Sequence, residues 1–160
     1  MEDRGRRIED RGFEDRGFED RGLRTLKLFL PPPSSKPQSS IPQKIMFTFE
    51  SLDVWKRSLE FANVMFDIAD GLPRQYQRSL GEQLRRAALS VPTNIAEGKG
   101  RDTQKQQAYF YNIAKGSIYE VVSLLAMIGK RGCLARKVYS IHYREADEIA
   151  AMITALARKG

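Results

Sequence analysis

The sequence contains little of the chemistry from which most enzymes build active sites. Its 160 residues include one histidine, His142, and one cysteine, Cys133. A single thiol excludes an intramolecular disulfide and is typical of a reducing compartment. One histidine supplies at most one Ser-His-Asp or Cys-His set, and it cannot provide the Glu-x-x-His pairs that di-iron bundles place on two helices. We therefore expect no catalytic residues, no metal and no cofactor.

Long hydrophobic runs are also missing. The longest, "VVSLLAMIG" at 121–129, is far shorter than the roughly 20 residues that cross a bilayer as a helix. The first 22 residues mix acids with bases, and "LKLFL" at 26–30 is too short for the apolar region of a secretory signal. We expect a cytoplasmic protein without a membrane partner.

Residues 1–45 lack the periodic apolar positions from which a core is built. "EDRG" occurs four times between residues 2 and 22, and "PPPSSKPQSSIP" follows at 31–42. Alternating charges with one apolar residue per repeat cannot bury a core, and the proline-rich stretch cannot enter a helix interior. We predict a disordered tail over 1–45 and a globular domain over 46–160, with Met46 as a possible natural start.

From Met46 onward the spacing of apolar residues is helical. One stripe steps by three and four along the first helix and comprises Leu52, Trp55, Leu59, Ala62, Phe66 and Ala69. Ser79 with Glu82, and Thr103 with Gln106, have the spacing of capping boxes that begin the second and third helices. No segment alternates as a strand does. The pattern predicts an all-α, antiparallel up-down-up-down four-helix bundle.

The second helix carries two stripes and an internal proline. Its predicted core stripe is Leu84, Ala88, Val91 and Ile95. Pro92 removes a backbone hydrogen bond and is expected to kink the helix, and Gly98 and Gly100 are expected to end it through positive φ angles. A polar stripe lies on a flank of the helix and comprises Gln83, Arg86, Ser90, Asn94 and Glu97. Its small polar members favour a close contact with another helix or another subunit over a solvated face.

The stretch "QLRRAALSVPTNIAEGKGR" at 83–101 closely resembles the signature of a four-helix-bundle family. That family was first described from intervening sequences in bacterial 23S ribosomal RNA genes. "FESLDVW" at 49–55 and "FYNIAKGSIYEV" at 110–121 resemble its first and third helices, in the same order. The family has a second acid two residues after Glu120, where this chain has Val122.

This resemblance implies a small all-helical protein that assembles as a homo-oligomeric ring, most simply a homopentamer. Because the sequence offers no catalytic set, we expect a basic protein that is not an enzyme. A related group, the accessory variability determinant of diversity-generating retroelements, associates with a reverse transcriptase and nucleic acid. The resemblance assigns an architectural role to the positions that match the family pattern. These include Pro92, Gly98, Gly116, Tyr119 and Glu120.

The formal net charge is +7, with 27 lysines and arginines against 20 acids. In an up-down bundle the first and third connections lie at one end. That end would collect six bases: Arg74, Arg78, Lys130, Arg131, Arg136 and Lys137. One hypothesis is that they bind the phosphate backbone of RNA or DNA without reading its sequence. The alternative is a protein-interaction scaffold whose charge only keeps it soluble.

The tail interpretation has a direct consequence for stability. If residues 1–45 contribute no packing, a chain that begins at Met46 should unfold at the same temperature as the full-length protein. Thermal unfolding followed by circular dichroism compares the two chains. A loss of several degrees in the shorter chain would show that the tail packs on the bundle.

Overall fold

The computed structural model describes residues 47–159, which form four long helices joined by short connections. The long helices are α2 (Asp53–Asp70), α4 (Glu82–Lys99), α5 (Gln104–Lys130) and α6 (Arg136–Lys159). Three short elements complete the order: the 3₁₀-helix η1 (Thr48–Ser51), α3 (Arg74–Tyr76) and the π-helical turn η2 (Gln77–Gly81). There is no strand between residues 47 and 159. The predicted all-α, four-helix class is confirmed, and the predicted tail lies outside the described residues.

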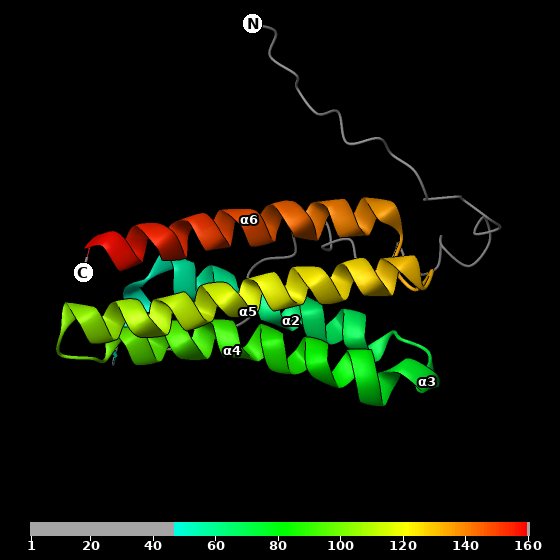
Figure 1. The fold of residues 1–160 in the computed structure, drawn as a ribbon, viewed down its shortest axis with the longest axis horizontal. Helices are drawn as coiled ribbons and strands as arrows, with labels where there is room; N and C mark the ends of the chain where they lie inside the picture. The colour runs from blue at the N-terminus through cyan, green and yellow to red at the C-terminus, as the bar shows by residue number, and fades with distance from the viewer. Residues whose placement is uncertain (1–46, 160) are drawn as a thin grey trace, which may run out of the picture.

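The long helices lie side by side, and Figure 1 shows that the chain reverses direction from each one to the next. Helix α4 packs against both α2 and α5, and α5 also packs against α6. The contact between α2 and α6 is smaller. It includes a bidentate ion pair, in which Arg57 Nε and Nη2 lie 2.6 and 2.8 Å from the two Glu145 oxygens. Arg57 also pairs with Glu148, so a polar clamp supports this less extensive seam.

The core-facing stripe of α2 differs from the predicted one. Ala62 and Ala69 are buried as expected, but Leu59 is 42% exposed and Phe66 is only half-buried. The buried face comprises Val54, Ser58, Phe61, Ala62, Met65, Ile68 and Ala69. Both stripes step by three and four, so periodicity alone cannot choose between them. The stripe that faces the core is determined by where α4 and α6 pack against α2, and the sequence of α2 alone does not specify this.

The predicted capping box at Ser79 and Glu82 is wrong. Helical structure begins earlier, at Arg74 directly after Pro73, and passes through η2 into α4. The Ser79 hydroxyl donates to the Tyr76 carbonyl at 3.4 Å and does not accept a capping bond. Proline fixes φ near the helical value before the first turn, so Pro73 is the effective start signal. In contrast, Thr103 caps α5 as predicted, because its Oγ1 accepts from the Gln106 N–H at 3.3 Å.

The predicted core stripe of the second helix is confirmed, because Leu84, Ala88, Val91 and Ile95 are completely buried in α4. Pro92 is buried too, and α4 continues without interruption on both sides of it. Four-helix packing supplies enough apolar burial to hold this helix together despite the hydrogen bond that the proline removes.

Gly98 and Gly100 do not have the role expected of them. Among the glycines between residues 47 and 159, only Gly132, after α5, has a positive φ. Gly98 lies inside α4 and is buried, and a Cβ at that position would lie 2.6 Å from Tyr111 Cε1. The Tyr111 side chain is only 1% exposed and burial raises its pKa, so the ring has little room to move. Gly98 is therefore required by the close approach of α4 and α5.

This contact gives a stability prediction. Gly98→Ala should destabilise the protein by about 1–3 kcal/mol, because an added methyl overpacks the buried Tyr111 ring. Gly100→Ala is the matched control, since its Cβ would meet backbone oxygens only at ordinary distances of 3.5 and 3.7 Å. Urea unfolding measures both variants. Equal stability of the two would show that Gly98 is tolerant and that the contact does not constrain the helices.

Candidate nucleic-acid interface

The two connections predicted to meet at one end of the bundle do so. Figure 1 places α3 and the α5–α6 turn at the same end. The six predicted bases lie in or next to these connections, and all are exposed. They are Arg74 in α3, Arg78 in η2, Lys130 at the end of α5, Arg131 in the turn, and Arg136 and Lys137 at the start of α6. We call these residues the basic end.

A hydrogen-bonded network holds the first connection in place. The side-chain amide of Gln77 donates to the carbonyls of Asp70 and Leu72, at 2.9 and 2.8 Å, and so satisfies the last turn of α2. The Gln77 carbonyl oxygen accepts from Arg85 Nη2 at 3.0 Å, and Arg85 also pairs with Asp70. The backbone that carries Arg74 and Arg78 is thereby fixed against both α2 and α4.

This network also removes an acid from the local electrostatics. Asp70 and Glu82 flank the first connection in sequence, and Asp70 pairs with Arg85 rather than with a residue of the basic end. Within the described chain, Arg74, Arg78, Lys130, Arg131 and Lys137 form no ion pair. Their positive charge is therefore available to an external anion.

The position of Lys137 is unfavourable for the isolated bundle. It lies in the first turn of α6, where the helix dipole presents its positive end. The helix dipole does not stabilise a cation at this position. An anion bound there would interact favourably with both Lys137 and the N-terminal end of the helix. The arrangement suits anion binding better than it suits stability.

Cys133 lies in the same turn but is not poised as a nucleophile. It is half-buried, and its Sγ lies 3.6 Å from the Arg131 carbonyl oxygen. Burial raises the pKa of the Cys133 thiol, and the nearby Arg131 charge only partly opposes that shift. At neutral pH the group is thus mainly a protonated thiol, which is a poor nucleophile.

The opposite end of the bundle has a different charge pattern. There Arg101 pairs with Glu97, and the Arg101 guanidinium lies 4.6 Å from the centre of the Phe110 ring. Asp102 follows directly in the sequence. Arg101 and Glu97 offset each other, and Asp102 partly offsets the charge of Lys99 and Lys105, so the field at this end is partly cancelled.

The polar stripe of α4 makes contacts inside the molecule. Ser90 Oγ lies 2.8 Å from Ser117 Oγ of α5, and Asn94 Nδ2 donates to the carbonyl and hydroxyl oxygens of Ser90. Arg86 Nη2 lies 3.8 Å from Glu120 Oε1. The stripe thus forms a polar seam between α4 and α5. Gln83 is exposed, and Glu97 forms an ion pair with Arg101.

Residues of the third-helix motif, and Val122 directly after it, lie in the middle of α5. Tyr119 is exposed, and the Lys115 Nζ lies 5.9 Å from the centre of its ring. Gly116 is exposed with open space around it. Val122, which replaces the expected second acid, is partly buried against the core. Val122 therefore makes an apolar contact with the core at a position where an acid would make a polar one.

Sequence reasoning missed the residues that support the site. The Gln77 cap and the Arg57 clamp were not foreseen, since each joins elements far apart in the chain. The ion pair between Asp70 and Arg85 was not foreseen either, because it too joins two elements. The only available signal was a glutamine four residues after Pro73 of the Gly-Leu-Pro break, near a helix end whose free carbonyls need donors.

The described residues contain neither a membrane-spanning helix nor a cluster of metal-ligand side chains. No helix between residues 47 and 159 is long and apolar enough to cross a bilayer. In the same part of the chain, no three His, Cys, Asp or Glu side chains gather as metal ligands would.

Comparison with known proteins places this geometry in a family. No curated protein matches the chain. A crystal structure from Bacteroides thetaiotaomicron VPI-5482, described as a protein of unknown function from the S23 ribosomal protein family, has the same fold with a TM-score of 0.62. The two sequences are 22% identical over 66% of this chain and 95% of the other. The family described as 23S rRNA-intervening sequence protein matches residues 50–155, and the chain belongs to this family.

Proposed function

We propose that the protein is a non-enzymatic nucleic-acid-binding module that acts as a closed homo-oligomer. The basic end carries the proposal. Six exposed bases converge from two connections, while the neighbouring Asp70 is paired with Arg85. Such a surface attracts phosphates through charge, and its residues lack a groove-reading element that would select a base sequence. The expected ligand is therefore the phosphate backbone of RNA or DNA.

Assembly would strengthen this attraction. Residues 46–160 contain 17 lysines and arginines and 12 acids, a surplus of five positive charges per subunit. Five subunits would together carry about +25, and a ring would repeat the basic end around one face. Repeated weak contacts on one rigid body raise the overall affinity through effective concentration. A homopentamer, the number that the family resemblance favours, would display thirty such bases.

The alternative partner is a protein, with a reverse transcriptase as the example that the resemblance offers. In that case the bases would serve solubility, and binding would depend on apolar surface rather than on salt. The two proposals differ in how affinity responds to ionic strength, since releasing counterions from phosphates makes nucleic-acid binding steeply salt-dependent.

The basic end can be tested by removing its charge. We expect Lys130, Arg131, Arg136 and Lys137, changed together to Gln, to weaken binding to structured RNA and duplex DNA alike. The plot of log K against log salt should become shallower by several units, since each lost phosphate contact removes roughly one. Fluorescence anisotropy at several salt concentrations gives both quantities.

The matched control removes the same charge elsewhere. Lys56, Lys99, Lys105 and Lys115, changed together to Gln, also subtract four positive charges but lie away from the basic end. This variant should keep most of the salt dependence. If both variants lose affinity equally, only net charge matters. If neither loses affinity, the scaffold alternative is favoured and the basic end has no role in binding.

A further inference from the structure

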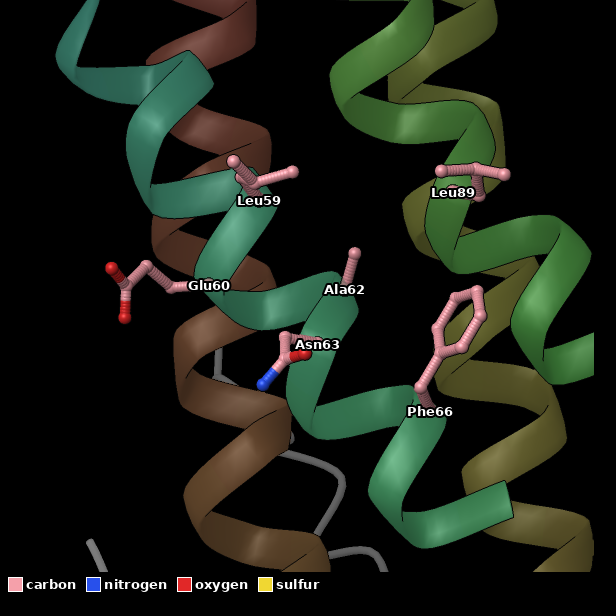
Figure 2. A pocket seen from close by; sticks show the side chains of 6 residues that line it. All are labelled: Leu59, Glu60, Ala62, Asn63, Phe66 and Leu89. Carbon is pink, nitrogen blue, oxygen red and sulfur yellow. The ribbon is translucent and has the colours of Figure 1, made fainter. Parts of the chain in front are cut away.

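Two exposed apolar surfaces of the bundle differ in the charges around them. A groove of about 400 Å³ lies between α2 and α4, and Figure 2 shows the Phe66 ring directed from α2 toward Leu89 on α4. None of the side chains that line this groove is basic: they are Leu59, Glu60, Ala62, Asn63, Phe66 and Leu89. The groove therefore lacks the charge that binds a phosphate. The other surface begins at the basic end and continues along α6.

Two tyrosines form this second surface. Tyr143 is 48% exposed, and its ring centre lies 5.9 Å from that of Tyr139, with the ring planes tilted by 44°. Tyr139 is partly buried against the core, so its contact limits the orientations that the Tyr143 ring can adopt. An exposed aromatic ring that is held in this way is the kind of surface on which a planar group stacks.

The tyrosine pair continues the basic end along one side of α6. Arg136, Tyr139 and Tyr143 are spaced by three and then four residues, which places them on one face of the helix. Glu145, which pairs with Arg57 of α2, follows Tyr143 by two residues and therefore lies about 200° around the helix from it. The tyrosines thus lie on the side of α6 that faces away from α2.

Basic side chains accompany the tyrosines on the exposed surface of α6. Lys137 and Arg144 are exposed and seven residues apart, so they also share a face of the helix. Within the described chain neither of them forms an ion pair. Asp147 is exposed about one turn beyond Tyr143, on the side away from the basic end. Phosphates are therefore attracted between the basic end and Tyr143 and repelled beyond it.

We infer that Tyr143 stacks on an unpaired base of a nucleic acid whose phosphates contact the basic end. This inference rests on the proposed function and narrows its ligand to a strand that contains unpaired nucleotides. In the interior of a duplex, neighbouring base pairs cover both faces of each base, so only an unpaired base can present a face to the ring. Stacking adds affinity without selecting a sequence, because every base has a π face.

The distance along α6 suits a short stretch of a single strand. Arg136 and Tyr143 are seven residues apart, which corresponds to about 10 Å along the helix axis at 1.5 Å per residue. A stacked strand advances about 3.4 Å per nucleotide, so roughly three nucleotides connect a phosphate at Arg136 with a base at Tyr143. Because Asp147 repels phosphates beyond the ring, the strand runs from Tyr143 toward the basic end.

Ligands of equal charge separate stacking from phosphate binding. A single-stranded DNA oligomer and an abasic strand of the same length carry the same phosphates, and the wild type should bind the strand with bases more tightly. Tyr143→Leu should weaken binding to that strand about fivefold or more, which is the typical contribution of one stacked base. Its binding to the abasic strand and to a long duplex should not change. Fluorescence anisotropy at several salt concentrations should give an unchanged slope of log K against log salt, since no phosphate contact is lost.

Two control variants test whether the ring itself is responsible. Tyr143→Phe keeps the ring and should bind all three ligands as the wild type does. Tyr109→Leu removes another exposed tyrosine, near the start of α5 and therefore at the opposite end of the bundle, and should change no affinity. If circular dichroism shows that Tyr143→Leu loses helical content, Tyr143→Gln replaces it with the same expectations, and the comparison of the two strands on the wild type needs no variant.

The outcomes distinguish this inference from the proposed function. A wild type that binds the duplex but binds both single strands equally would overturn the stacking contact and leave phosphate binding standing. The same holds if Tyr143→Leu binds like the wild type, if it loses affinity for all three ligands equally, or if Tyr109→Leu loses as much. A wild type that binds none of the three ligands would contradict the proposed function itself.

Discussion

The rest of the structure depends on helix α4, which must pack closely against α2 and α5 at the same time. It does so with small residues: Ala87 and Ala88 are buried in the core, and Gly98 leaves room for the buried Tyr111 ring. Larger side chains at these positions would push the neighbouring helices apart and weaken the dispersion contacts of the core. On the outer side of the α2–α4 contact a groove remains beside the exposed Leu89.

The position of α4 also determines the geometry of the proposed interface. Arg85 extends from α4 to Asp70 at the end of α2 and to Gln77 in the connection. These contacts fix the start of the second helical segment, from which Arg74 and Arg78 project. The basic end is thus built on a connection held to both α2 and α4, and within the described chain Arg74, Arg78, Lys130, Arg131 and Lys137 form no ion pair. The contacts among Arg85, Asp70 and Gln77 stabilise this end without using the side chains of the basic end.

Much of the fold could be predicted from the sequence, because α4 and α5 carry one dominant apolar stripe each. The α2 stripe could not, since two stripes with equal periodicity compete and only the neighbouring helices decide between them. Gly98 was predicted to end a helix because glycine readily adopts positive φ angles. Its contact with Tyr111 arises only from the packing of α4 against α5, which the local sequence does not show. The six bases were found because chain reversal alone brings them together. The Gln77 network needed coordinates, since it pairs side chains with specific backbone carbonyls.

The central claim is that the basic end meets the phosphate backbone. Lysine acetylation of the full-length protein, with and without structured RNA, tests it most directly, because protected lysines report where the RNA lies. The account predicts that Lys130 and Lys137 lose reactivity when RNA is bound, while Lys99 and Lys105 at the opposite end keep theirs. Equal protection at both ends, or protection confined to Lys99 and Lys105, would contradict it.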